Sequence, residues 1–118
     1  MANPRECVIV AYGRSAVGKN KKALANTHPV DYAGQVLKGV LERVPQLNPA
    51  DIQEVIYGCA RTEADTSYDT ARVICMRAGL PLSVPGITVS RFCESSSDAI
   101  ALGASLIQSG SMDIVVAG

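Results

Sequence analysis

Four cysteines and one histidine are the residues of this 118-residue sequence best suited to covalent catalysis. The cysteines, Cys7, Cys59, Cys75 and Cys93, lie far apart and form no Cys-x-x-Cys pair. This spacing argues against a zinc site and against a disulfide scaffold, so we predict no metal site. His28 is the single imidazole, and any Cys-His catalytic pair within these residues would have to use it.

Cys93 has the most distinctive position of the four cysteines. It follows an apolar run at residues 87–89 and precedes a stretch rich in Ser, Ala and Gly at residues 95–109, whose period predicts a helix. The unpaired N–H groups and the positive dipole at a helix N-terminus stabilise a thiolate, which is the nucleophile that covalent acyl transfer needs. The alternative is a small buried apolar residue, which is our interpretation of Cys7 and Cys75.

A second motif, Gly-x-x-x-x-Gly-Lys, occurs at residues 13–19 and is typical of a phosphate-binding loop. That loop requires Ser or Thr next, to place an oxygen on magnesium, but Asn20 follows here. Pro29 also leaves little room for the helix that should begin at once. We therefore predict a basic surface loop, and nucleotide hydrolysis remains a weak alternative that magnesium-dependent nucleotide binding would reveal.

Strands and helices are predicted to alternate along the chain. Strands are expected at four short apolar runs, residues 7–11, 54–57, 87–89 and 113–117. Helices are expected at residues 29–44, capped by Thr27 or His28 and ended by Pro45, at residues 66–78, stopped by Gly79, and at residues 95–109, ended by Gly110. Asn48 should cap one further helical turn before the second strand.

This βαβαβαβ order predicts an α/β fold with a mainly parallel sheet, because parallel neighbours need crossover connections. The small residues of the 95–109 helix imply that other backbones approach it closely, as they approach a helix buried in a layered fold. The sequence stops at Gly118, where a strand ends and where α/β proteins place their functional loops. We therefore expect residues 1–118 to be an incomplete N-terminal domain.

Charge and hydropathy limit the classes of partner that we expect for this chain. Eleven Lys and Arg residues balance eleven Asp and Glu residues, so no long-range attraction favours nucleic acid. The first residues lack the features of a secretory signal, and no apolar run is long enough to span a bilayer. We expect a cytoplasmic protein with no nucleic-acid or membrane partner.

Residues 89–100, Val-Ser-Arg-Phe-Cys-Glu-Ser-Ser-Ser-Asp-Ala-Ile, resemble the nucleophile segment of thiolases, whose pattern is Val-Asn-x-x-Cys-x-Ser-Gly-x-x-Ala. Residues 14–19 are similar to the family's Arg-Thr-Pro-x-Gly loop. Further stretches are similar to the family in the same order: residues 51–58, 71–72, 78–81, 84–89 and 110–118. Several weak matches in the right order are more specific than any one of them.

The resemblance implies a thiolase-like layered fold and a CoA-dependent acyltransferase of lipid metabolism, most simply an acetyl-CoA C-acetyltransferase. Cys93 would take an acyl group from acyl-CoA, for Claisen condensation or thiolytic cleavage. The resemblance also implies a homodimer or homotetramer that uses a coenzyme A thioester as substrate and holds no permanent cofactor. The family's activating histidine, second cysteine and oxyanion site come from later residues, so we expect residues 1–118 alone to be inactive.

Three residues depart from the thiolase pattern. Ser90 replaces Asn, Ser96 replaces Gly, and Glu94 places a carboxylate beside Cys93. A carboxylate there opposes thiolate formation unless it points into solvent. These departures keep open a divergent subfamily with a different acyl substrate and a noncatalytic thiolase-like acyl-binding or subunit protein. A separate alternative among enzymes is a ketoacyl synthase relative that takes its acyl group from acyl carrier protein.

Overall fold

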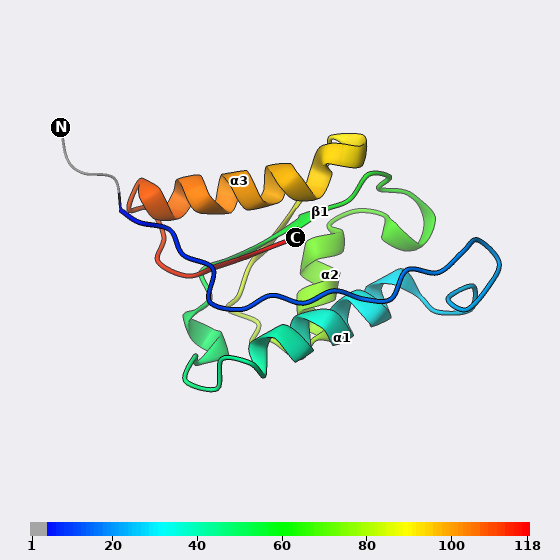
Figure 1. The fold of residues 1–118 in the computed structure, drawn as a ribbon, viewed down its shortest axis with the longest axis horizontal. Coiled ribbons are helices and arrows are strands. Elements are labelled where there is room, and N and C mark those ends of the chain that lie inside the picture. The colour runs from blue at the N-terminus through cyan, green and yellow to red at the C-terminus, as the bar shows by residue number, and fades with distance from the viewer. Residues whose placement is uncertain (1–4) are drawn as a thin grey trace.

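Residues 5–118 are described by a computed structural model, in which helices and strands alternate after a long N-terminal segment (Figure 1). The helices are α1 (Pro29–Leu41), α2 (Thr70–Arg77) and α3 (Ser95–Gln108), and the strands are β1 (Glu54–Gly58), β2 (Gly86–Val89) and β3 (Val115–Ala117). Single 3₁₀ turns precede β1, α2 and α3; they are η1 (Pro49–Asp51), η2 (Ala64–Thr66) and η3 (Phe92–Glu94).

The three strands form one parallel sheet in the order β2-β1-β3. Ile56 of the central strand lies opposite Ile87 of β2 and Ala117 of β3. Because parallel neighbours need crossovers, α2 links β1 to β2 and α3 links β2 to β3. Figure 1 shows α3 along one face of the sheet, with α1 and α2 on the other. The predicted α/β class, with a parallel sheet between helical layers, is confirmed.

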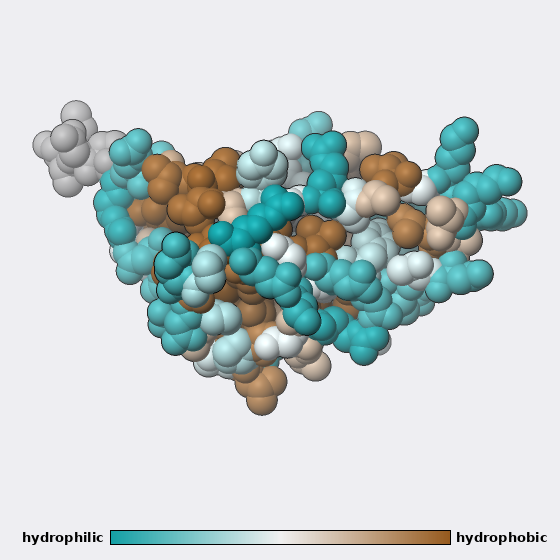
Figure 2. All heavy atoms as spheres, turned by 60° about the horizontal axis from the view of Figure 1, so that its bottom comes forward, coloured by the Kyte–Doolittle hydropathy of each residue, from teal (hydrophilic) through white to brown (hydrophobic). Residues whose placement is uncertain are grey.

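The prediction of a first strand at residues 7–11 is wrong. This segment forms no ladder with any strand of residues 5–118, and Val8, Ile9 and Val10 are 63–80% exposed. β-branched residues suit a strand, but a strand exists only where a neighbour accepts its hydrogen bonds and covers its side chains. The order from residue 5 onward is therefore αβαβαβ. Figure 2 shows apolar side chains gathered on the face turned forward, toward the end of the molecule that carries the N-terminus.

Local signals place most helix ends correctly. The His28 imidazole caps α1 by accepting the Val30 N–H at 3.3 Å, while Gly79 and Gly110 follow α2 and α3 with φ of 78° and 77°. Two boundaries differ from the prediction. α1 ends at Leu41 instead of the predicted residue 44, because residues 43 and 44 form turns in which each N–H bonds to the carbonyl three positions earlier. α2 begins at Thr70, since the residues before it form the separate turn η2.

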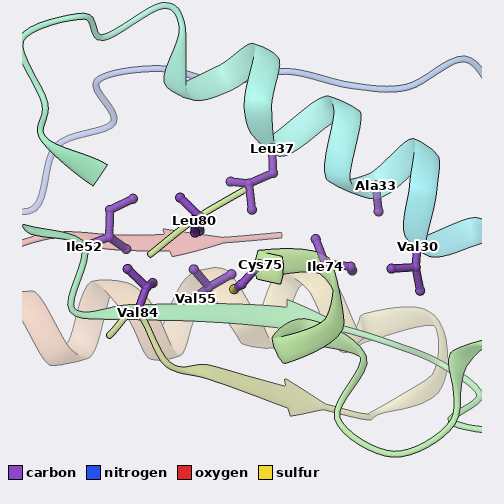
Figure 3. Packing of buried hydrophobic residues seen from close by; sticks show 9 residues of the cluster. All are labelled: Val30, Ala33, Leu37, Ile52, Val55, Ile74, Cys75, Leu80 and Val84. Atoms are coloured by element: carbon purple, nitrogen blue, oxygen red, sulfur yellow. The ribbon is translucent and has the colours of Figure 1, made fainter. Parts of the chain in front are cut away.

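The main hydrophobic core lies between α1, α2 and one face of the sheet (Figure 3). It combines nine buried side chains: Val30, Ala33, Leu37, Ile52, Val55, Ile74, Cys75, Leu80 and Val84. Successive residues of a strand point to opposite faces, so Ile56, which is 0% exposed, is buried on the side of α3. A Cβ added at Gly103 of α3 would lie 3.1 Å from the Val115 side chain and 3.9 Å from that of Ile56, so small residues let this face of α3 approach the sheet. The sequence predicted a helix buried in the fold, but within residues 5–118 the other side of α3 is exposed, with Ile100 at 52%.

None of the helices in the described part of the chain combines the length and the apolar character needed to cross a bilayer.

Candidate functional site

Cys93 lies in the turn η3, between the end of β2 and the start of α3. Its side chain is exposed. The loop that carries it lies beside the loop that follows β1: the Cys59 N–H donates to the Val89 carbonyl at 2.9 Å, and the Ser90 hydroxyl donates to the Ala60 carbonyl at 3.3 Å. The thiol therefore stands at the carboxyl ends of two neighbouring parallel strands, the edge at which α/β folds bind their ligands.

The start of α3 is pressed against the end of β1. A Cβ added at Gly58 would lie 2.4 Å from the carbonyl carbon of Ser95 and 2.4 Å from the amide nitrogen of Ser96. Only a residue without a Cβ allows two backbones to approach this closely. The side chain of Ser96, which departs from the thiolase pattern, is itself exposed. The close contact at this end of the helix is thus provided by Gly58.

Charged groups surround Cys93 on the surface. The Arg91 guanidinium Nε lies 2.7 Å from the Asp98 carboxylate in the first turn of α3, which leaves little net charge from this pair. Glu94 is exposed and makes no side-chain hydrogen bond to the helix N-terminus. Solvent therefore screens the Glu94 carboxylate, and the N–H groups at the start of α3 are not occupied by it.

Residues 7–118 match the family described as "Thiolase, N-terminal domain". The chain belongs to the thiolase family. Its relatives include a steroid 3-ketoacyl-CoA thiolase of Mycobacterium tuberculosis, 42% identical over 96% of this chain and 28% of the relative. The 3-ketoacyl-CoA thiolases of Saccharophagus degradans and Stutzerimonas stutzeri are 37% and 34% identical, each over 98% of this chain and 30% of its own length. The chain thus spans about three tenths of the thiolases it matches.

The thiolase match also includes the single histidine, His28, which lies far from Cys93 in the fold. His28 caps α1, on the face of the sheet opposite α3 (Figure 1), and its Nε2 is 3.9 Å from Asp65. Within residues 5–118 no hydrogen bond or ion pair links His28 to Cys93. The prediction that His28 is a capping residue is confirmed.

The other cysteines differ from Cys93 in burial. Cys75 is 0% exposed within the core, and burial raises the pKa of its thiol, with nearby Arg72 acting in the opposite direction. A buried thiol with a raised pKa stays protonated and unreactive. Cys75 is therefore structural, as predicted. The same prediction for Cys7 is wrong within residues 5–118, because Cys7 is only half-buried, like Cys59.

The Gly-x-x-x-x-Gly-Lys motif forms a loop, as predicted. No helix begins after Lys19; the chain passes through turns until α1 starts at Pro29. Val17 within the motif is 92% exposed. A phosphate-binding loop needs the N-terminus of a helix directly behind it, and this loop has none. Two shallow hollows lie along α1, and neither is lined by Cys93.

Sequence reasoning missed one residue of this site. Ser95 was grouped with the other small residues of α3, yet it is 3% exposed and its hydroxyl makes two hydrogen bonds inside the turn that carries Cys93. Ser95 stands at the Ser of the thiolase pattern Cys-x-Ser-Gly, which was a signal in the sequence, but that match does not predict its hydrogen bonds.

Proposed function

We propose that this chain is the N-terminal part of a CoA-dependent acyltransferase of the thiolase type, in which Cys93 accepts the acyl group. The observation that supports the proposal most is the position of the Cys93 thiol. It is exposed, at the carboxyl edge of a parallel sheet and directly before α3, within residues that match thiolases. A helix N-terminus there favours negative charge on sulfur and on nearby oxygens.

The chemistry proceeds in two steps. In cleavage, the Cys93 thiolate attacks the 3-keto carbon of a 3-ketoacyl-CoA, the bond between carbons 2 and 3 breaks, and the departing acetyl-CoA carbanion takes a proton. The thiolate of free CoA then attacks the acyl-cysteine, which releases a shortened acyl-CoA and restores Cys93. Condensation is the same sequence in reverse. The proton donors and oxyanion groups that these steps require are assigned to residues outside 5–118.

The substrate class follows from the names of the relatives. Each of the three thiolases is named for a 3-ketoacyl-CoA, and one for a steroid 3-ketoacyl-CoA. We assign a 3-ketoacyl-CoA and CoA as substrates of this protein, with acetoacetyl-CoA, the substrate of an acetyltransferase, as the smallest member. No resident cofactor is needed for the steps above, because the thioester and the cysteine supply the reacting groups.

A homodimer or homotetramer and a cytoplasmic location belong to the same proposal. Ile100 and Leu102 of α3 are 52% and 38% exposed, and apolar side chains on one helix favour a packing partner. The four cysteines are free thiols, which suits a reducing compartment. Light scattering of the full-length protein tests the assembly, and a monodisperse monomer would contradict it.

The test of the proposed activity is turnover of acetoacetyl-CoA and longer 3-ketoacyl-CoAs with CoA by the full-length protein, with products separated by chromatography. We expect acetyl-CoA to form, and Cys93→Ala to reduce the rate by about 10³-fold or more. Cys59→Ala, which removes the thiol in the neighbouring loop, should stay within a few-fold of the wild type. Absence of turnover at every chain length would favour the noncatalytic alternative, and turnover only with acyl carrier protein as donor would favour the ketoacyl synthase.

A further inference from the structure

The Ser95 hydroxyl closes the turn that carries Cys93. Its Oγ accepts the Arg91 N–H at 2.8 Å and donates to the Phe92 carbonyl at 2.7 Å. Ser95 is 3% exposed, so water does not compete for these two bonds. The side chain of Ser95, which follows Cys93, is therefore tied to the backbone of the two residues that precede Cys93.

The turn needs such a tie because its backbone is strained. Phe92 has a φ of 48°, in the left-handed region, which is unfavourable for a residue other than glycine. Its side chain is 74% exposed, so apolar burial within the described residues compensates for little of that cost. The two buried hydrogen bonds of Ser95 help to offset it.

Other contacts around the turn are weaker. The ion pair between Arg91 and Asp98 joins side chains that are 71% and 35% exposed, so solvent weakens it. Glu94 stands at the N-cap of α3 without a side-chain bond to the helix. Ser95 is therefore the main side-chain restraint on the conformation of residues 91–95.

We infer that Ser95 is a positioning residue, which holds the Cys93 thiol at the N-terminus of α3 in its reactive orientation. The inference rests on the proposed role of Cys93 as the acyl acceptor. Ser95 touches neither substrate nor the reacting atoms in this role, and it acts through the backbone of the turn.

The experiment compares Ser95→Ala with Ser97→Ala in the full-length protein. Ser97 is the control because it lies in the same first turn of α3 with an exposed side chain. For Ser95→Ala we expect kcat for 3-ketoacyl-CoA cleavage to fall by about 10- to 100-fold with KM nearly unchanged, since displacement of a reacting atom by about 1 Å has an effect of this size. The rate of Cys93 alkylation by iodoacetamide at one fixed pH should also change, because the thiol leaves its place beside the helix N-terminus. Ser97→Ala should match the wild type in both assays.

A Ser95→Ala protein with wild-type kcat and an unchanged rate of Cys93 alkylation would overturn the inference. If Ser95→Ala is too unstable to assay, hydrogen exchange at the Arg91 amide of the unaltered protein tests the same hydrogen bond. Protection of that amide supports the bond to Ser95, and exchange at the rate of an open loop contradicts it. Failure of the proposed function can be distinguished from failure of this inference by the Cys93→Ala variant. Full activity of that variant would show that Cys93 does not accept the acyl group.

Discussion

Gly58 is the residue whose replacement should displace Cys93 most directly without altering it. Gly58 ends β1 against the first turn of α3, and an alanine Cβ there would lie 2.4 Å from Ser95 C and 2.7 Å from Ser95 O. Carbon atoms pack at about 3.5–4.0 Å, so α3 would have to move away by about 1 Å or more. Since all the obstructing atoms belong to the backbone, no side-chain rotation can relieve the overlap.

Two magnitudes follow for Gly58→Ala. Overpacking in a closely packed interior costs about 1–3 kcal/mol, so the free energy of unfolding should fall by at least this amount. A shift of about 1 Å in a reacting group reduces catalysis by about 10²-fold, so the rate of Cys93 acylation should fall by that factor.

The assay combines thermal unfolding with rapid-quench mass spectrometry of acyl-Cys93 in the full-length protein. Gly39→Ala is the matched control, because no heavy atom lies within 4 Å of an added Cβ at Gly39 in α1. Alanine in place of glycine within a helix should raise stability by about 0.5–1 kcal/mol without an effect on acylation. Unchanged stability and acylation in Gly58→Ala would refute the account of how α3 is held.

Three further predictions concern burial. At about pH 8, iodoacetamide should modify Cys93 about tenfold faster than Cys75 or more, because burial raises the pKa of the Cys75 thiol. Peptide mass mapping measures both rates, and equal rates would contradict this prediction. Ile56→Ala should lower the free energy of unfolding by about 2–5 kcal/mol in denaturant titrations, since Ile56 is 0% exposed, whereas a loss below about 1 kcal/mol would mean that the site between α3 and the sheet is not packed. The pKa of Glu54 is raised, chiefly by burial, so the folded state favours the protonated carboxyl. The stability that this protonated carboxyl contributes to the folded state is therefore lost as pH rises through the folded pKa. Glu54→Gln should therefore stabilise the protein more at about pH 7 than at about pH 4, and thermal unfolding with an equal effect at both pH values would disprove it.

The features that the sequence predicted well depend on short-range chemistry. Gly79 and Gly110 end helices because each takes a positive φ, and His28 caps α1 through a bond to a residue two positions away. The strand before Cys93 and the helix after it could be predicted because each has its own hydrophobic pattern and the order of elements is local.

The features that were missed depend on partners distant in sequence or on an unusual backbone angle. Residues 7–11 have the composition of a strand, but pairing is a property of the neighbour, and no strand of residues 5–118 supplies one. The role of Ser95 requires Phe92 to adopt a positive φ, which no propensity of phenylalanine predicts. The contact of Gly58 with α3 joins residues 37 or more positions apart.

The most direct test of the central claim, that Cys93 accepts an acyl group, is intact mass spectrometry of the full-length protein after incubation with acetyl-CoA. The account predicts one acetyl adduct per chain that is lost in Cys93→Ser and retained in Cys59→Ser, the variant of the half-buried thiol in the neighbouring loop. Absence of an adduct with both short- and long-chain acyl-CoAs, or an adduct that persists in Cys93→Ser, would contradict it.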